Sequence, residues 1–197
     1  MRILRSSDYR RMPWKNGGGV TREIAVSPAG ATFETLDWRV SLAAVVEDGP
    51  FSIFNGMDRT LCVTRGAGIQ LQADDSPPTT LHATSAPHSF DGSALTRAQL
   101  IDGPIEDLSV MSRRGRFRHS VRRVVVTDPW EFTTRSQSLI VYCQRGELTC
   151  IAGSTSEQLH ADDSALFDNA SGSIRVTTEQ TAEILVIEFF QYQAPPG

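Results

Sequence analysis

The sequence is a series of short apolar runs separated by turn-forming residues, and this spacing limits the fold more than any other feature. The runs are rich in Val, Ile, Leu and Phe and are bounded by Gly, Pro, Asp and Ser; they cover residues 38–46, 60–72, 121–127, 138–143, 173–178 and 183–190. No long stretch keeps the helical period of about 3.6 residues. We expect at most a short helix or turn near Ser7 to Met12, stopped by Pro13. The chain is predicted to be all-β.

Composition is that of a globular protein. The 197 residues are 40% hydrophobic and 21% charged, which excludes wholesale disorder. With 19 Lys+Arg against 23 Asp+Glu, the net charge of −4 argues against a dedicated nucleic-acid binder. No apolar run approaches the roughly 20 residues of a membrane span, and residues 1–5 lack the apolar core of a signal peptide. We expect a cytoplasmic protein without nucleic-acid or membrane partners.

The cysteines agree with that compartment. Cys62, Cys143 and Cys150 are odd in number and form no C-x-x-C motif, so neither a disulfide framework nor a thiolate zinc site is indicated. Free cysteines in apolar runs behave as small hydrophobic residues. We expect these thiols to be buried and structural.

A weak internal repeat divides the chain. Three short matches recur in the same order at offsets of 80, 78 and 77 residues: Arg65-Gly66 with Arg145-Gly146, Leu81-His82-Ala83 with Leu159-His160-Ala161, and Phe90-Asp91 with Phe167-Asp168. Such a repeat predicts two small antiparallel barrels or sandwiches in tandem. Their join is expected around Met111 to Ser120, a polar and Arg-rich stretch.

Several motifs carry a family resemblance. The segments 12–23 (MPWKNGGGVTRE), 38–42 (WRVSL), 48–52 (DGPFS), 54–59 (F-x-G-x-DR) and 107–115 (DL-x-VM-x-RRG) resemble the HutD/Ves family in order and spacing over essentially the whole chain. Two positions, Asn55 and Ser109, depart from the family pattern, where Pro and Asn are expected.

The resemblance implies an all-β fold of two tandem cupin-like antiparallel β-barrels, a bicupin, which is usually a homodimer. The N-terminal cupin half would be residues 1–115, with the ligand pocket, and the C-terminal half residues 116–197, as scaffold or dimer contact. The resemblance also implies a regulatory or accessory role in bacterial histidine utilisation.

Cupins usually hold a metal through a His-x-His pair, a Glu and a later His, and this chain lacks that ligand pattern. Residues 49–68 contain no histidine, and His82, His88, His119 and His160 are scattered singly. No Gly-x-Ser-x-Gly elbow, P-loop or Gly-x-Gly-x-x-Gly motif is present either. We expect no metal and no other cofactor, and we assign no catalytic residue.

A glycine-rich segment is the first candidate binding element. It places a cation, an amide and three unobstructed backbone N–H groups in a row, which can curl around an anion. An apolar wall and a hydroxyl donor flank it. The segment and its flanks comprise Trp14, Lys15, Asn16, Gly17, Gly18, Gly19 and Thr21. A plain loop is the alternative interpretation.

The remaining candidates lie on predicted strands. Alternation puts Arg39 and Ser41 on one face of a strand, either lining a barrel or facing solvent. Asp58 and Arg59 could form a buried ion pair or a structural salt bridge. His88 could serve as an acid or base, or bond to backbone at a strand end.

Together these residues favour a non-catalytic module that binds a small anionic metabolite in the first barrel. The candidate ligands are urocanate, formiminoglutamate and formylglutamate, with Arg39 and Arg59 on carboxylates. Two alternatives stay open: a metal-independent enzyme using His88 or Asp58, and a ligand-free protein-interaction module. The arginines of residues 113–123 are interpreted as a solvated linker, with an anionic partner as the alternative.

Overall fold

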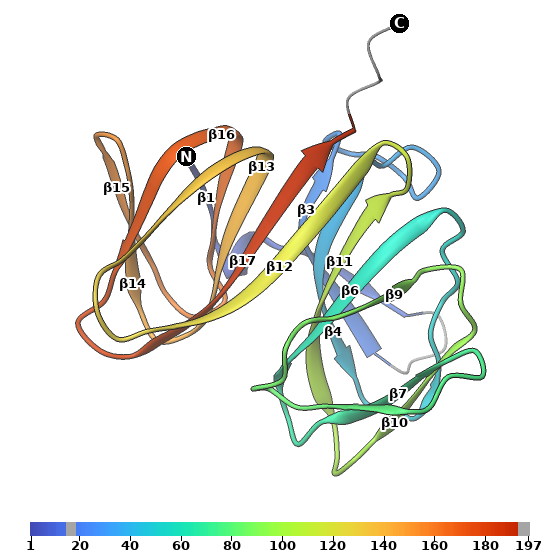
Figure 1. The fold of residues 1–197 in the computed structure, drawn as a ribbon. Coiled ribbons are helices and arrows are strands. Elements are labelled where there is room, and N and C mark those ends of the chain that lie inside the picture. Colours follow the sequence, from blue (N-terminus) through green and yellow to red (C-terminus); the bar gives the residue numbers. More distant parts are fainter. Residues whose placement is uncertain (15–18, 193–197) are drawn as a thin grey trace, which may run out of the picture. The chain divides into compact units, whose positions relative to one another are not determined.

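The computed structural model describes residues 1–14 and 19–192 and forms two compact units (Figure 1). One unit comprises residues 10–117, and the other combines residues 1–9 with the chain from 118 onward. Apart from a 3-10 turn, η1 (Ser6–Asp8), every regular element in the described ranges is a β-strand, so the all-β prediction is confirmed. No helix within those ranges is long and apolar enough to cross a membrane.

The unit of residues 10–117 is built from two antiparallel sheets. The six-stranded sheet has the order β2-β3-β4-β11-β6-β9, with strands β2 (Arg10–Pro13), β3 (Gly19–Ser27), β4 (Trp38–Val45), β6 (Met57–Arg65), β9 (His88–Asp91) and β11 (Ile105–Arg113). The four-stranded sheet has the order β5-β10-β7-β8, with β5 (Gly49–Pro50), β7 (Ile69–Ala73), β8 (Thr79–Leu81) and β10 (Thr96–Leu100). Apolar side chains of both sheets form one core: Val45, Leu61, Val63, Ile69, Leu71, Leu81, Ala98 and Ile105.

Strand β4 is buried on both faces. The exposed fractions of Trp38, Val40 and Leu42 are 3%, 0% and 0%, and those of Arg39 and Ser41 are only 6% and 2%. Because side chains alternate along a strand, Arg39 and Ser41 share the face of Val45, which belongs to the core between the sheets. The polar side of β4 therefore faces the interior of this unit and not solvent.

The other unit is a single seven-stranded sheet closed over its own core. Its order is β12-β17-β13-β16-β14-β15, with β1 also pairing with β16; the strands are β1 (Arg2–Leu4), β12 (Phe117–Val126), β13 (Trp130–Arg145), β14 (Leu148–Ala152), β15 (Thr155–Leu159), β16 (Ser164–Thr177) and β17 (Ala182–Gln191). Apolar residues of these strands, among them Val141, Phe167 and Val186, fill the core. Burial of β17 agrees with its long apolar run.

The first nine residues belong to this second unit, whereas the expected boundary placed them with the first. Strand β1 pairs with β16, from Arg2 opposite Leu166 to Leu4 opposite Ser164. The Arg5 guanidinium also forms an ion pair with Asp163 at 2.7 Å. Strand pairing over a long sequence separation decides this placement, and no local pattern in the sequence encodes it.

The internal repeat occupies equivalent places in the two units. Gly66 follows β6 with a φ of +92°, and Gly146 follows β13 with a φ of +84°. A Cβ on Gly66 would lie 2.5 Å from the carbonyl oxygen of Pro104, and one on Gly146 would lie 2.7 Å from that of Thr181. In each unit the glycine thus lets the chain turn tightly against the residue that precedes a later strand, β11 or β17.

The Arg-rich stretch contains the join, as predicted, because the two units divide between Phe117 and Arg118. Several of its arginines are exposed, but the stretch consists of two strands and a short turn and not of an irregular linker. Strand β11 continues to Arg113, and β12 begins at Phe117. The Arg113 side chain donates to three backbone carbonyls, and the Arg118 guanidinium lies 4.2 Å from the ring centroid of Phe190. These arginines are held by contacts within their own units, because planar guanidinium groups can bond carbonyls and stack on rings at once.

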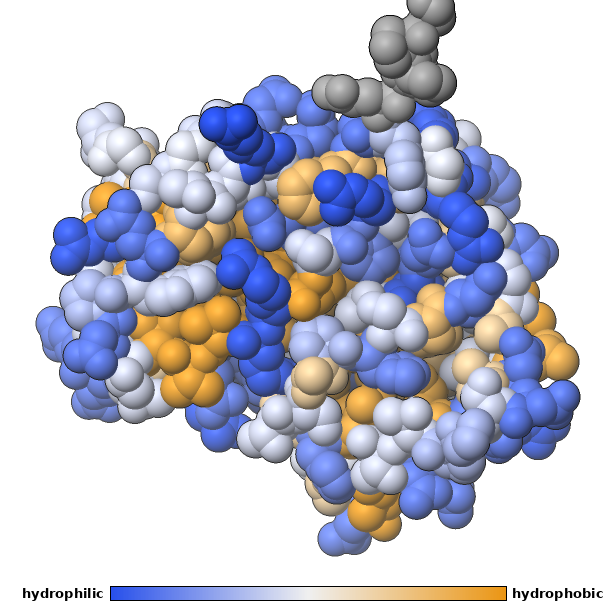
Figure 2. Space-filling model, in the orientation of Figure 1, coloured by the Kyte–Doolittle hydropathy of each residue, from blue (hydrophilic) through white to orange (hydrophobic). Residues whose placement is uncertain are grey.

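Exposed apolar side chains are interspersed with hydrophilic ones. On the face drawn in Figure 2, orange areas lie between blue and white ones. The large apolar residues that are more than a third exposed are Met1, Phe33, Val46, Ile53, Leu95, Ile101, Val125 and Tyr192. The three cysteines are buried, as expected.

Candidate functional site

The interior of the unit of residues 10–117 carries an unusual number of polar side chains. Strand register places them in rows that cross the six-stranded sheet on its inner face. The first row is Val26, Arg39, Met111, Arg59 and Phe90; the second is Glu23, Ser41, Ser109, Leu61 and His88; the third is Thr21, Ala43, Asp107 and Val63. We call this set the inner polar face.

Arg39 is neutralised within the inner polar face. Its Nε donates to the Glu23 carboxylate at 2.7 Å, and the two side chains are only 7% and 17% exposed. The guanidinium also lies 5.2 Å from the ring centroid of Phe33. A buried pair of this kind holds its geometry firmly, since separating the charges would leave each one unpaired.

Arg59 is held differently, inside a cage of aromatic rings. Its guanidinium carbon lies 5.5, 5.1 and 5.0 Å from the ring centroids of Phe51, Phe54 and Phe90. Its two terminal nitrogens donate to the backbone oxygen of Ser52 at 3.3 Å and to Ser109 Oγ at 3.5 Å.

The Arg59 guanidinium has unused donor capacity. Its Nε is buried and has no hydrogen-bond partner among the described residues. Burial lowers the pKa of Arg59 to about 10, while the charge of Asp107 raises it and that of Arg39 lowers it. The group therefore stays cationic at neutral pH and is not paired with a carboxylate within the described ranges.

Asp107 is the other buried charge of the inner polar face. Its side chain is on β11 between Ala43 of β4 and Val63 of β6, and the residue is 2% exposed. No hydrogen bond or ion pair links its carboxylate to another residue in the part of the chain that the structure describes. Burial raises the pKa of Asp107 to about 7, and Arg59 opposes that rise.

Six of the predicted binding residues lie on or against this interior. Arg39, Ser41, Arg59, Thr21 and His88 occupy its rows, and the Trp14 side chain packs against the adjoining core. Trp14 Nε1 donates to Thr21 Oγ1 at 2.8 Å. The His88 ring stacks on Phe90 with the ring centroids 6.0 Å apart.

Five of the other predicted residues belong to the glycine-rich segment. Lys15, Asn16, Gly17 and Gly18 lie outside the described residues. Gly19 begins β3, where a Cβ would lie 2.2 Å from the Ala44 carbonyl oxygen. This glycine is therefore required for close backbone approach.

The predicted Asp58–Arg59 ion pair was wrong. Neighbouring residues of a strand point to opposite faces, so Asp58 cannot follow Arg59 into the interior. Asp58 instead accepts hydrogen bonds from Arg114 at 2.7 and 2.9 Å, with its side chain 42% exposed. It is part of the outer surface.

Sequence reasoning missed Glu23, Asp107 and Ser109 as members of the site. Each occurred within a recognised motif but was given no role there. Ser109 and Asp107 alternate on β11 with Leu108 and Val110, in the same two-residue period as Arg39 and Ser41 on β4. This alternation of polar and apolar residues could have identified Asp107 and Ser109 from the sequence.

The described residues do not fit the metal site found in many cupins. No group of three His, Cys, Asp or Glu side chains gathers anywhere in residues 1–14 and 19–192. On the inner polar face, the carboxylate of Glu23 is engaged with Arg39, which leaves His88 and Asp107 as its only other candidate ligands.

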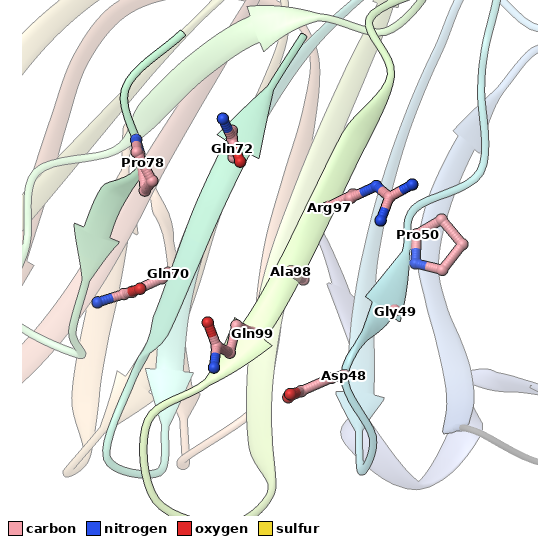
Figure 3. A pocket seen from close by; sticks show the side chains of 9 residues that line it. All are labelled: Asp48, Gly49, Pro50, Gln70, Gln72, Pro78, Arg97, Ala98 and Gln99. Atoms are coloured by element: carbon pink, nitrogen blue, oxygen red, sulfur yellow. The ribbon is translucent and has the colours of Figure 1, made fainter. Parts of the chain in front are cut away.

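A separate concavity of about 350 Å³ lies on the outer face of the four-stranded sheet. Figure 3 shows side chains of β5, β7 and β10 around it. Its lining is Asp48, Gly49, Pro50, Gln70, Gln72, Pro78, Arg97, Ala98 and Gln99. Arg97 and Gln99 are exposed, in contrast to the buried charges of the interior. This groove lacks the desolvated polar groups that build a specific site.

Known proteins resemble this chain in sequence over more than half of its length. The sequence profile of the HutD family matches residues 6–186. An uncharacterised 21.2 kDa protein in the hutC 3′ region of Pseudomonas putida is 37% identical over 118 residues, 60% of this chain and 61% of that protein. Protein Ves of Citrobacter koseri is 34% identical over 119 residues, 58% of this chain and 61% of that protein. The matched part thus spans 61% of the length of these curated relatives.

Solved structures extend the likeness to the fold. A conserved protein of unknown function from Pseudomonas aeruginosa PAO1 has a TM-score of 0.91 at 30% identity, over 96% of this chain and 98% of that one. HutD from Pseudomonas fluorescens SBW25, in a formate condition, has a TM-score of 0.83 at 32% identity, over 98% and 99%. A cupin barrel protein from Leptotrichia buccalis, at 9% identity over 91% and 95%, shares the fold alone with a TM-score of 0.58. The predicted bicupin architecture is confirmed.

Proposed function

This chain belongs to the HutD family, which is linked to histidine utilisation, and we propose that it is a non-catalytic accessory protein that binds a small organic acid. The binding site is the inner polar face of residues 10–117. The candidate ligands are the pathway intermediates urocanate, formiminoglutamate and formylglutamate. Binding would report the level of the intermediate to the rest of the pathway.

One observation carries the proposal: a buried guanidinium has donor capacity that the described residues leave unused. Arg59 is 6% exposed, its Nε has no partner among those residues, and three rings fix its position. Orphaned buried donors are rare in folded proteins because leaving one unsatisfied costs about 1–3 kcal/mol. A ligand carboxylate would satisfy it through a charge-assisted hydrogen bond.

The core of the second unit differs from the inner polar face, and this difference supports a binding role for the first unit and a scaffold role for the second. Its main core cluster is formed by apolar side chains such as Leu139, Val141 and Ile184, and its buried described residues include hydroxyl, amide and carboxylate groups but no arginine. Arg175 of this unit is exposed, in contrast to the buried Arg39 and Arg59 of the first unit. We therefore assign this unit a scaffold role, with the homodimer contact as part of the same proposal, to be tested by light scattering on purified protein.

Calorimetry with the three intermediates tests the proposed function. We expect wild type to bind at least one of them, and Arg59→Gln to weaken that binding at least tenfold, the equivalent of a charged hydrogen bond of about 1.5–3 kcal/mol. Arg97→Gln, on the outer groove, is the matched control and should bind as wild type does. Absence of binding at millimolar concentration of all three, or equal losses in both variants, would refute the proposal.

Catalysis is a second candidate because His88 lies on the same interior row as Ser41 and Ser109. A histidine there could transfer a proton to or from a bound acid. Turnover of any pathway intermediate that disappears in His88→Gln would favour an enzyme. Binding without turnover in both proteins would favour the accessory role.

A further inference from the structure

The inner polar face holds two buried opposite charges that do not pair with each other. Arg59 and Asp107 are 6% and 2% exposed, and no ion pair joins them. Ser109, which accepts from Arg59 Nη2, stands two positions from Asp107 on the same face of β11. Since two residues of a strand span about 7 Å, the Arg59 nitrogen at Ser109 lies about one row from the position of Asp107 on the same inner face.

Arg39, the second arginine of the inner polar face, does not change the net charge available to a ligand. Arg39 is closely paired with Glu23, so the pair contributes no net charge. Among the described residues of the inner polar face, the groups left to a ligand include one cation at Arg59 and one carboxylate at Asp107, with Ser41, Ser109 and His88 on the row between these two positions. Such a surface is complementary to a ligand with two unlike ends.

Resting on the proposed function, we propose that the site selects an acid with a single carboxylate and, about 7 Å away, a nitrogen that donates a hydrogen bond. The carboxylate binds Arg59 and the nitrogen binds Asp107. A dicarboxylate of the same length is rejected, because its second carboxylate would meet Asp107 in a desolvated interior where like charges repel strongly. This selection disfavours formiminoglutamate and formylglutamate, the two dicarboxylates among the candidate ligands of the proposed function. Asp107 thereby determines specificity.

Three five-carbon acids that differ only at one end test this selection: 5-aminopentanoate, glutarate and pentanoate. We expect calorimetry at about pH 8.5, above the pKa of about 7 that burial gives Asp107, to show that wild type binds 5-aminopentanoate at least tenfold more tightly than glutarate, with pentanoate between them. Asp107→Asn should remove most of this preference, because the amide is neutral. Asp58→Asn, a carboxylate on the outer surface of the same unit, should leave the preference unchanged.

The outcomes separate this inference from the proposed function. Wild-type binding of glutarate as tight as that of 5-aminopentanoate would overturn the selection while leaving acid binding intact. An unchanged preference in Asp107→Asn would overturn the role of Asp107. If wild type binds a pathway intermediate but none of the three probes, the selection rule fails and acid binding survives. The wild-type comparison decides even if a variant folds poorly.

Discussion

Inside the barrel of residues 10–117, Arg39 Nε donates to the Glu23 carboxylate at 2.7 Å, so one of the two interior guanidinium groups is already neutralised. The strand register explains the contact, since Glu23 of β3 pairs with Ser41, the inward neighbour of Arg39 on β4. This pairing distinguishes Arg39 from Arg59, although both were expected to bind a ligand carboxylate. Arg39 is therefore better described as a structural residue that lines the candidate site than as a group that binds a ligand carboxylate.

The Glu23–Arg39 pair should be sensitive to removal of either partner. We expect Glu23→Gln to lower the free energy of unfolding by about 3 kcal/mol, because a buried guanidinium loses its counter-charge. The double variant Glu23→Gln/Arg39→Met should recover much of that loss. Urea denaturation of the single and double variants measures the coupling. Additive effects would show that the pair contributes no coupling.

Asp107 should make stability fall as the pH rises. Its pKa is raised from 3.8 to about 7 in the folded state, so between about pH 4 and pH 7 the folded protein binds more protons than the unfolded chain. The free energy of unfolding therefore decreases through this window, by at most about 4 kcal/mol from this group.

The measurement for Asp107 is a difference between two proteins across pH. Asp107→Asn cannot titrate, so its stability advantage over wild type should grow from pH 4 to pH 7 and then level off. Taking the difference cancels the opposite trend from carboxylates such as Asp91, whose pKa is lowered to about 2 by the Arg114 hydrogen bond. A difference that is constant with pH would contradict the prediction.

Gly66 and Gly103 offer a matched test of the turns in the repeat. Both have positive φ, +92° and +69°, but a Cβ on Gly66 would lie 2.5 Å from the Pro104 oxygen, whereas one on Gly103 meets nothing within 4 Å. Gly103→Ala should cost about 1–2 kcal/mol from backbone strain alone. Gly66→Ala should cost about 1–3 kcal/mol more, because its neighbours must also move. Equal midpoints in urea would show that the collision is relieved without cost.

The sequence was most informative where its information was local. Alternation on β4 correctly put Arg39 and Ser41 on one face, and the repeat placed Gly66 and Gly146 at equivalent turns. The pairing of Glu23 with Arg39 depends on a bulge in β3, where the register shifts between Glu23 and Ala25.

Long-range pairing accounts for what could not be predicted. Strand β1 joins β16 across more than half of the chain, which no local pattern announces. The pairing of Asp58 with Arg114 likewise depends on the register between β6 and β11, which brings Asp58 opposite Ser112. The adjacency of Asp58 and Arg59 in the sequence led to the prediction of an ion pair, but neighbouring side chains of a strand point to opposite faces and cannot form it.

Arg113 should hold the loop that carries Phe33 over Arg39. Its Nε donates to the Leu36 carbonyl at 2.7 Å, and its Nη2 donates to the carbonyls of Phe33 and Glu34 at 2.8 and 3.0 Å. The Phe33 ring in turn lies 5.2 Å from the Arg39 guanidinium and 4.9 Å from the ring of Phe54. The planar guanidinium of Arg113 therefore holds residues 33–36, which bring Phe33 over Arg39 at one end of the inner polar face.

Replacing Arg113 by lysine keeps the positive charge but removes the planar guanidinium, so it tests whether the geometry of the hydrogen bonds matters. Arg113→Lys keeps the cation, but an ammonium cannot reach the same carbonyls in one plane, so we expect a loss of about 1–2 kcal/mol and faster amide exchange in residues 31–36. Arg114→Lys is the control, because its ion pairs with Asp58 and Asp91 are half exposed and should contribute less than about 1 kcal/mol. If both variants exchange at the wild-type rate in residues 31–36, the loop is held by its apolar contacts, and Phe33 would then stay over Arg39 without Arg113.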